Sequence, residues 1–195
     1  MSMLTTWGSA VAEHLAEHLV ELRGGPTVTI RPIRGDDGPR LASYLEGLSS
    51  ESRYMRFMQA TPRISSRLVE SFTGGDPAGR LVLVAVLGTE IVGEAMLVVD
   101  RADDEVAEVA YSVADRLHRR GLGRALVELL LAAGRRRDVR RIRADLLGEN
   151  RASVALLLAM GARLWFESGA LVAELVLDGT GAPQAETATS GVANQ

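Results

Sequence analysis

The sequence contains no cysteine and no lysine, although it has 195 residues and 22 basic side chains, all of them arginine. Without cysteine the chain can form neither a disulfide bond nor a thiolate metal site. Without lysine it cannot form a Walker-type phosphate loop, which needs a lysine. The protein also cannot modify lysine side chains of its own chain, because it has none.

Aromatic residues and long apolar runs are also scarce. Only 4% of the residues are aromatic, so aliphatic residues and alanine must build the core that a hydrophobic content of 47% allows. The longest nearly continuous apolar run, residues 81–88, is far shorter than the roughly 20 residues of a membrane-spanning helix. The first 22 residues lack a basic segment ahead of their apolar stretch. We therefore expect no targeting signal, no membrane partner and a cytoplasmic location.

The charge and the histidines exclude two further classes of site. The net charge is −3 at pH 7, whereas nucleic-acid-binding proteins usually carry a basic excess, so we expect no nucleic-acid partner. His14 and His18 stand four residues apart, but no third metal ligand is evident near them and glutamates surround them. We expect no metal site.

Hydrophobic periodicity predicts one domain in which helices and strands alternate. Residues 9–22 have the apolar stripe of an amphipathic helix, so we expect an N-terminal helical extension over 1–26 that covers the sheet or mediates a homodimer. A domain over 27–178 follows, and the small polar residues 179–195 predict a disordered tail. The elements predicted inside the domain are, in chain order, a strand at 27–33, a helix capped by Asp36 or Asp37, helices at 49–57 and 64–72, an antiparallel meander of strands at 80–88, 90–100 and 105–115, a helix from 122, a strand at 140–147, a helix at 151–160 and a closing hairpin.

A glycine loop with the sequence HRRGLGR, residues 118–124, separates the meander from the next helix. The amides at a helix start lack intrahelical partners, the helix dipole is positive there, and glycines allow a ligand to approach the backbone closely. Such a place suits a phosphate or pyrophosphate. Position 126 is leucine where the dinucleotide fingerprint wants a third glycine, which argues against that class. The alternative is an ordinary turn with solvated arginines.

The glycine loop resembles the signature of the GCN5-related N-acetyltransferase (GNAT) family, which binds acyl-CoA. That signature is Gln or Arg, two residues, Gly, one residue, then Gly or Ala, and it stands between the fourth strand and the third helix. Residues 118–123 fit this frame, with His118 at the first position. The resemblance covers about residues 27–177 and implies an α/β fold of the α+β type, with a mixed, mostly antiparallel central sheet of about seven strands flanked by helices.

A second segment also resembles the family, which carries an Asn after its fifth strand, then a helix that ends near Gly-Phe. Asn150 and Gly161 match, and Ala162 replaces the Phe. The resemblance implies acetyl-CoA as acyl donor and no metal. Its expected contacts are the 119–124 amides with the pyrophosphate (Arg119, Arg120, Gly121, Leu122, Gly123 and Arg124), and Tyr111, Ser112, Val113 and Asn150 with the pantetheine arm. The alternative for Asn150 is an ordinary helix N-cap.

Acyl transfer to an amine needs a base, because an alkylammonium has a pKa near ~10.4, and it needs a donor to the oxyanion. Strand alternation places Glu108 on one face with the small residues Ala110 and Ser112, which leaves space for a substrate. Similar lysine acetyltransferases often carry a Glu at this place, acting through water, so Glu108 is the predicted base. The alternative is a solvent-facing strand glutamate. Glu94, on the neighbouring strand, is the second candidate.

The remaining catalytic roles follow from the resemblance. It implies that the Val113 amide is the oxyanion donor. Many relatives place a tyrosine acid seven residues after the Asn, but here that position is Leu157. Ser153, one turn into the helix, is a weak candidate for a hydrogen bond near the sulfur. Otherwise the thiolate leaves without a side-chain acid, or Tyr111 helps.

The stretch LSSESRYMRF, residues 48–57, resembles bacterial protein-lysine acetyltransferases. The alternative is an amphipathic helix with Tyr54 and Phe57 in the core. Together these features predict an acetyl-CoA-dependent N-acetyltransferase whose acceptor is a protein lysine. The alternatives are the same chemistry on a small-molecule amine and a module that senses acyl-CoA without turnover.

Overall fold

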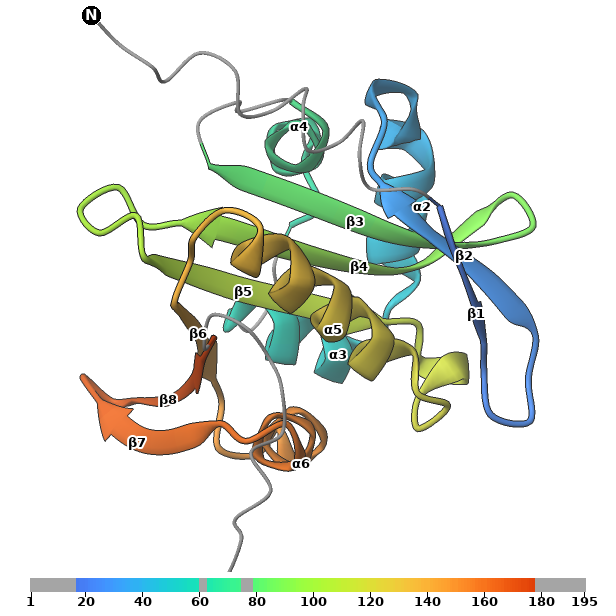
Figure 1. Cartoon of the computed structure of the whole chain (residues 1–195). Helices are drawn as coiled ribbons and strands as arrows, with labels where there is room; N and C mark the ends of the chain where they lie inside the picture. The colour runs from blue at the N-terminus through green and yellow to red at the C-terminus, as the bar shows by residue number, and fades with distance from the viewer. Residues whose placement is uncertain (1–16, 60–62, 75–78, 178–195) are drawn as a thin grey trace, which may run out of the picture.

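The computed structural model describes residues 17–59, 63–74 and 79–177, which form one eight-stranded sheet with helices on both faces (Figure 1). The strands are β1 (His18–Glu21), β2 (Thr27–Pro32), β3 (Arg80–Leu87), β4 (Glu90–Val99), β5 (Val106–Val113), β6 (Arg141–Leu146), β7 (Arg163–Glu167) and β8 (Ala170–Val176). The helices are η1 (Gly35–Asp37), α2 (Gly38–Gly47), α3 (Ser50–Phe57), α4 (Ser66–Thr73), η2 (Asp115–Leu117), α5 (Leu122–Arg135) and α6 (Arg151–Ala159).

The sheet has the order β1-β2-β3-β4-β5-β6-β8-β7. Within the described ranges β5 and β6 form its one parallel pair, and the other neighbours are antiparallel. The predicted mixed, mostly antiparallel sheet and the meander of β3, β4 and β5 are therefore confirmed. The sheet has eight strands instead of about seven because β1 is a strand.

The predicted helix over 9–22 is wrong at its C-terminal end, since residues 18–21 form β1 and pair with β2. Residues 9–16 lie outside the described part, as does the tail 179–195. The helical stripe required Leu19 to face inward, but Leu19 is 76% exposed, whereas Leu22 is buried. The turn at Gly24-Gly25-Pro26 folds this segment back on β2, so a hairpin replaces the helix. His18 is therefore in a strand, and His14 lies outside the described residues.

Helices α5 and α2 cover opposite faces of the sheet. On one face Leu122 and Leu126 of α5 pack on Gly93 of β4, where an added Cβ would come within 3.3 Å of a Leu126 methyl and of the Ser112 carbonyl oxygen. Glycine at this position lets the start of α5 lie close to β4. On the other face α2 buries Leu41, Tyr44 and Leu45, as its periodicity predicted. None of the helices in the described ranges is long and apolar enough to cross a membrane.

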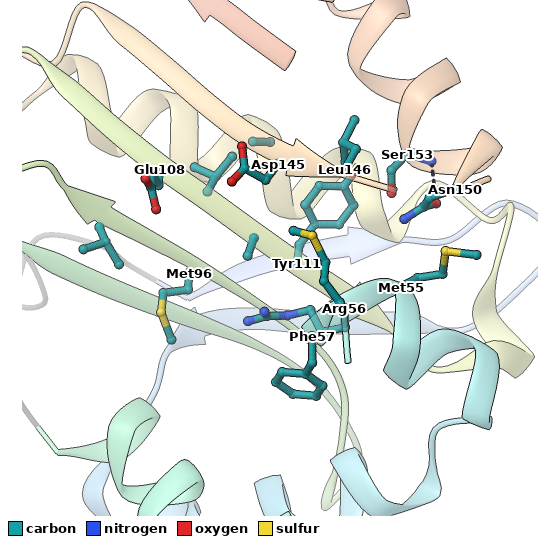
Figure 2. A pocket seen from close by; sticks show the side chains of 15 residues that line it. Met55, Arg56, Phe57, Met96, Glu108, Tyr111, Asp145, Leu146, Asn150 and Ser153 are labelled. Atoms are coloured by element: carbon teal, nitrogen blue, oxygen red, sulfur yellow. Dashed lines mark hydrogen bonds between the residues drawn. The ribbon is translucent and has the colours of Figure 1, made fainter. Parts of the chain in front are cut away.

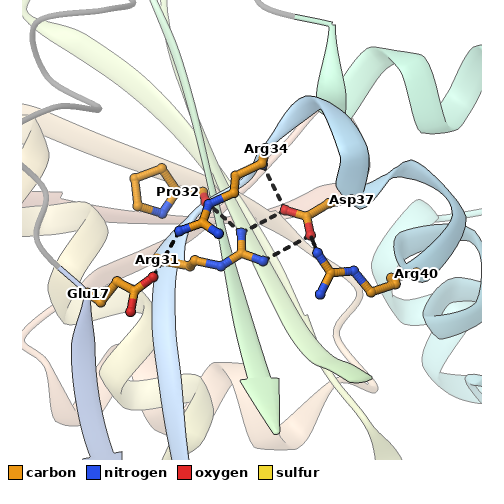
Figure 3. Close-up of polar contacts among 6 residues, drawn as sticks. All are labelled: Glu17, Arg31, Pro32, Arg34, Asp37 and Arg40. Atoms are coloured by element: carbon orange, nitrogen blue, oxygen red, sulfur yellow. Dashed lines mark hydrogen bonds and ion pairs between the residues drawn. The ribbon is translucent and has the colours of Figure 1, made fainter. Parts of the chain in front are cut away.

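Asp37 precedes α2 but does not cap it with its side chain, which corrects the predicted capping role. Its fully buried carboxylate accepts hydrogen bonds from Arg31 at 2.7 and 2.9 Å, from the Arg34 amide at 2.7 Å and from Arg40 (Figure 3). Burial alone would raise the pKa of Asp37, but the hydrogen bond and charge of Arg31, with the Arg34 amide, hold it below its usual value. The carboxylate thereby ties β2 to the start of α2.

Candidate active site

Strands β5 and β6 diverge in the middle of the sheet. They pair only from Val106 to Glu108, opposite residues 141–143. Beyond that point β5 continues along β4 as far as Val113, and β6 continues along β8 as far as Leu146. The second half of β5 therefore has an unpaired edge toward β6.

The open edge of β5 presents peptide N–H groups. Ala114 donates its N–H to the Val92 carbonyl of β4 at 2.9 Å. Because hydrogen-bonded and non-hydrogen-bonded positions alternate along an antiparallel pair, the N–H groups of Tyr111 and Val113 point away from β4. They face the gap where β6 has left the sheet, which suits the predicted donation from the Val113 amide to an oxyanion.

The glycine loop forms the start of α5 and leaves its first amides uncapped. Gly121 is the N-cap residue with a φ of 94°, a left-handed conformation that strains residues with a side chain, and no side chain caps the helix there. Arg119 also has a positive φ, 59°. The first N–H groups of α5 thus remain available, and the helix dipole makes this end positive.

The uncapped amides line a cavity of about 870 Å³ between the glycine loop, the end of β5, α3 and the start of α6. Most of the predicted cofactor contacts lie on its wall, namely Tyr111, Ser112, Val113, Arg119, Gly121, Leu122, Gly123, Arg124 and Asn150. Arg120 does not, because its guanidinium donates to the Gly24 carbonyl at 2.6 Å. The Leu122 side chain is buried in the core, so this residue offers its backbone.

His118, which departs from the family signature, forms a hydrogen bond with the end of β5. Its Nε2 lies 2.9 Å from the Val113 carbonyl oxygen. A carbonyl oxygen only accepts, so Nε2 carries the proton in this contact. His118 therefore fixes the peptide next to the N–H groups that face the gap.

A second cavity of about 310 Å³ lies on the α3 side of the diverging strands (Figure 2). Its walls include Phe57, Met96 and Val98, and the carboxylates of Glu108 and Asp145 also line it. The two cavities share five residues, which are Met55, Arg56, Tyr111, Asn150 and Ser153. A ligand that extends from the glycine loop would meet a second ligand at this junction.

Glu108 is exposed to the second cavity and has no ion pair or hydrogen bond among the described residues. Its neighbour across the parallel pair is Arg143, but the Arg143 guanidinium donates to Glu174 at 3.1 Å and lies over the Trp165 ring. The carboxylate of Glu108 therefore has no side-chain partner within the described residues.

Glu94 has a different environment, which argues against its second place among the predicted bases. It is fully buried and lines neither cavity. Arg56 donates to its two oxygens at 2.6 and 3.2 Å, and the Ser112 hydroxyl donates to it at 2.7 Å. A hydroxyl has one proton, and the Ser112 hydroxyl gives its proton to Glu94. The Tyr44 hydroxyl is therefore the donor in its contact with the Ser112 hydroxyl oxygen, 2.9 Å away. Desolvation would lower the pKa of Arg56, but the charge of Glu94 raises it above the usual value.

Tyr111 and Ser153 meet at the junction of the cavities. Burial raises the pKa of Tyr111, and the nearby Ser153 side chain offsets part of this rise. The Tyr111 hydroxyl is shielded from solvent and makes no well-formed hydrogen bond within the described residues. Asn150 is the N-cap of α6, accepting from the Ser153 amide at 3.1 Å, so its capping role is confirmed while its amide nitrogen remains available to a ligand. Leu157 is buried and offers no proton.

Asp115 fixes α3 over the cavities. Its carboxylate accepts from the Ser49 amide at 3.0 Å and from the Ser49 and Ser52 hydroxyls at 2.7 Å. Burial would raise the pKa of Asp115, but these hydrogen bonds and the nearby His118 lower it to about 2. The contact joins the N-terminus of α3 to the segment that precedes the glycine loop.

The predicted helix over 49–57 is confirmed. Phe57 is partly buried against the core, and none of the residues of α3 is fully buried.

The low pKa of Asp115 predicts a pH-dependent part of the stability. A depressed native pKa contributes stability that is present above the unfolded value, near ~3.9, and is lost as the pH falls toward the native value. Because the carboxylate is exposed and screened by solvent, we expect only about 1 kcal/mol. Urea unfolding at pH 6 and pH 3 should show that Asp115→Asn is less stable than wild type at pH 6 and closer to it at pH 3. Asp104→Asn should show no such change, and an equal deficit of Asp115→Asn at both pH values would contradict the assignment.

Asp145 and Arg23 are two of the cavity residues that the sequence did not predict. Asp145 stands in β6 between the buried residues Ala144 and Leu146, and it lines the smaller cavity together with Glu108 (Figure 2). Arg23 lies in the turn between β1 and β2 and lines the larger cavity. No spacing within the sequence links either residue to the glycine loop, so both required the folded chain.

Comparison with known proteins gives a consistent result. The model of the acetyltransferase (GNAT) family matches residues 45–162, more than half of the chain. The solved GNAT domain of S. lividans PAT superposes with a TM-score of 0.77 at 35% identity, over 83% of this chain and 97% of that one. The predicted family resemblance and fold are thereby confirmed.

Two curated relatives have 29% identity to this chain. Acetyltransferase Pat of Mycolicibacterium smegmatis matches over 145 residues, 73% of this chain, but the match spans only 43% of that protein's length. Acetyltransferase PA5475 of Pseudomonas aeruginosa matches over 159 residues, 78% of this chain and 84% of that protein.

Proposed function

Since this chain belongs to the GNAT family of acetyl-CoA-dependent N-acetyltransferases, we propose that it acetylates the ε-amino group of a protein lysine. The observation that carries this proposal is the meeting of two cavities at Tyr111 and Ser153. One cavity has the chemistry of a diphosphate site, and the other has the chemistry of an amine site.

The larger cavity fits coenzyme A. The uncapped amides of α5 and the Arg119 side chain suit the diphosphate, since anions bind at helix N-termini. The unpaired edge of the second half of β5 offers strand-like hydrogen bonds to an extended pantetheine amide chain. Bound in this direction, acetyl-CoA supplies a reactive thioester at the junction.

The smaller cavity fits a primary amine on an aliphatic stem. Methionine, phenylalanine and valine side chains can contact the methylenes, and Glu108 and Asp145 can pair with the ammonium. A lysine side chain has this combination of apolar stem and charged end. The cavity opens beside α3, the segment whose sequence resembles protein-lysine acetyltransferases.

In the proposed reaction Glu108, through a water molecule, takes a proton from the ammonium. The neutral nitrogen then forms a bond to the acetyl carbon, and the Val113 N–H stabilises the negative charge that develops on the carbonyl oxygen. The bond between carbon and sulfur breaks as a donor group gives the sulfur a proton, the second proton of the nitrogen restores that donor, and Glu108 releases the first proton to solvent. The products are an acetylated amine and the free thiol of coenzyme A.

Tyr111 is the proton donor that we propose for the sulfur. Its hydroxyl is buried at the junction, lacks a well-formed hydrogen bond and has a raised pKa, so it stays protonated at neutral pH. A thiol has an ordinary pKa near ~8.5, so the thiolate is already a fair leaving group and the benefit of an acid is moderate.

Tyr111→Phe should therefore lower kcat by about 10-fold and leave the affinity for acetyl-CoA nearly unchanged. Thermal stability should not fall, because the removed hydroxyl has no well-formed hydrogen bond to lose. Steady-state kinetics with melting curves would check both points, with Tyr54→Phe on α3 as the matched control. Unchanged kcat in Tyr111→Phe would remove the residue from this role.

The proposed acceptor can be tested with labelled acetyl-CoA and a panel of proteins, lysine peptides, amino acids and polyamines. Mass spectrometry should find label on lysine side chains of particular proteins. Label only on small amines would contradict the protein acceptor, and tight binding without release of thiol would indicate a sensor.

A further inference from the structure

The turn between β1 and β2 is attached to the glycine loop, although it precedes the segment that the family model matches, residues 45–162. The Arg23 amide donates to the Arg120 carbonyl at 3.0 Å, and the Arg120 guanidinium donates back to the Gly24 carbonyl at 2.6 Å. The buried side chain of Leu22 anchors the turn in the core. These contacts fix the backbone of Arg23 beside the start of α5.

The Arg23 side chain lies over the glycine loop in the larger cavity. Its Nε is 3.9 Å from the position that a Cβ on Gly121 would occupy, and Arg119 and Arg124 line the same cavity. Arg124 is paired with Glu128 at 2.8 Å, whereas Arg23 has no ion pair among the described residues. The side chain of Arg23 is exposed.

A cation in this place is unfavourable without an anion. The N-terminus of α5 is positive, so the helix dipole and Arg119 both repel the Arg23 guanidinium. The backbone contacts hold the residue there without help from its charge. A bound phosphate would turn this repulsion into attraction, and the guanidinium fork matches phosphate oxygens in charge and shape.

We infer that Arg23 is a further cofactor-binding residue, which holds the diphosphate of coenzyme A against the first amides of α5. This inference rests on the proposed cofactor site. It adds a side chain from the N-terminal hairpin to a site otherwise built from β5, α5 and α6. The diphosphate is the assigned group, and the 3′-phosphate is not, because Arg23 lies beside Gly121 at the uncapped amides.

Calorimetry with coenzyme A and with 3′-dephospho-coenzyme A tests the inference on wild type, Arg23→Ala, Arg23→Lys and the exposed control Arg101→Ala. Arg23→Ala should weaken the binding of both ligands equally, by about 10-fold, which is ~1.4 kcal/mol, because it removes a charge-assisted contact to the diphosphate. The loss of affinity in Arg23→Ala should be smaller at high salt, and Arg23→Lys should recover part of the affinity. The KM for acetyl-CoA should rise with kcat unchanged, and Arg101→Ala should match wild type.

Three results would overturn the inference. If Arg23→Ala bound both ligands as tightly as wild type, Arg23 would have no role while the proposed function stood. If only coenzyme A were weakened, the contact would be with the 3′-phosphate and the diphosphate assignment would be wrong. If wild type bound neither ligand, the proposed function would fail together with this inference.

Discussion

Glu108→Gln is expected to lower kcat by at least about 100-fold at pH 7, the lower end of what a general base contributes. Glutamine keeps the shape of the side chain but cannot take the proton. Glu108 lines the smaller cavity and not the larger one, so the Kd for coenzyme A should change less than about two-fold. Its exposure and lack of an ion pair make a large loss of stability unexpected.

The pH profile separates a base from a merely structural glutamate. A lysine-type amine has a pKa near ~10.4, so the need for a base falls as the pH rises toward that value. The deficit of Glu108→Gln relative to wild type should shrink between pH 7 and pH 10. Glu167→Gln, at an exposed site on β7, serves as control. Unchanged turnover in Glu108→Gln, or a deficit independent of pH, would contradict the role.

Glu94→Ala is expected to destabilise the fold by about 3–5 kcal/mol, because it leaves the Arg56 guanidinium buried without its counter-ion. The Ser112 hydroxyl would also lose its acceptor. Urea unfolding measures the change. Glu94 lines neither cavity, so the remaining folded protein should still bind coenzyme A.

A double variant shows whether the loss of stability in Glu94→Ala comes from the unpaired charge of Arg56. Replacing a buried ion pair by apolar residues of similar volume is often neutral, so Arg56→Met with Glu94→Leu should recover much of the stability. Arg56 lines both cavities, so this variant is not expected to recover activity. If Glu94→Ala were as stable as wild type but inactive, Glu94 and not Glu108 would be the base.

The elements that sequence predicted well are those with local signals. Strand alternation and short turns predicted the β3-β4-β5 meander, and the glycine pattern after a strand predicted the uncapped start of α5. Glu108 was chosen because its strand neighbours on the same face are small; the structure places it on the wall of the smaller cavity, and its role as base stays a prediction. These signals depend on residues close in the chain, so no tertiary contact was needed to read them.

The features that the sequence did not predict depend on contacts between residues far apart in the chain. The stripe that includes Leu19 fits a helix, and only pairing with β2 makes the segment a strand. Asp37 has a capping residue's position, but Arg31 of β2 takes its carboxylate. Glu94 shares a sheet face with Glu108, and Arg56, 38 residues earlier, decides that one is buried and the other exposed. Long-range charge pairs of this kind leave no periodic pattern in a sequence.

The most direct test is an NMR titration of backbone amides with coenzyme A and with pantetheine, which lacks phosphate. Coenzyme A should shift the amide signals of Gly121, Leu122 and Gly123 as well as those of Tyr111 and Val113. Pantetheine should shift only the two strand amides. Binding of coenzyme A that leaves the signals of residues 121–123 in place, or no binding at all, would contradict a diphosphate site at the start of α5.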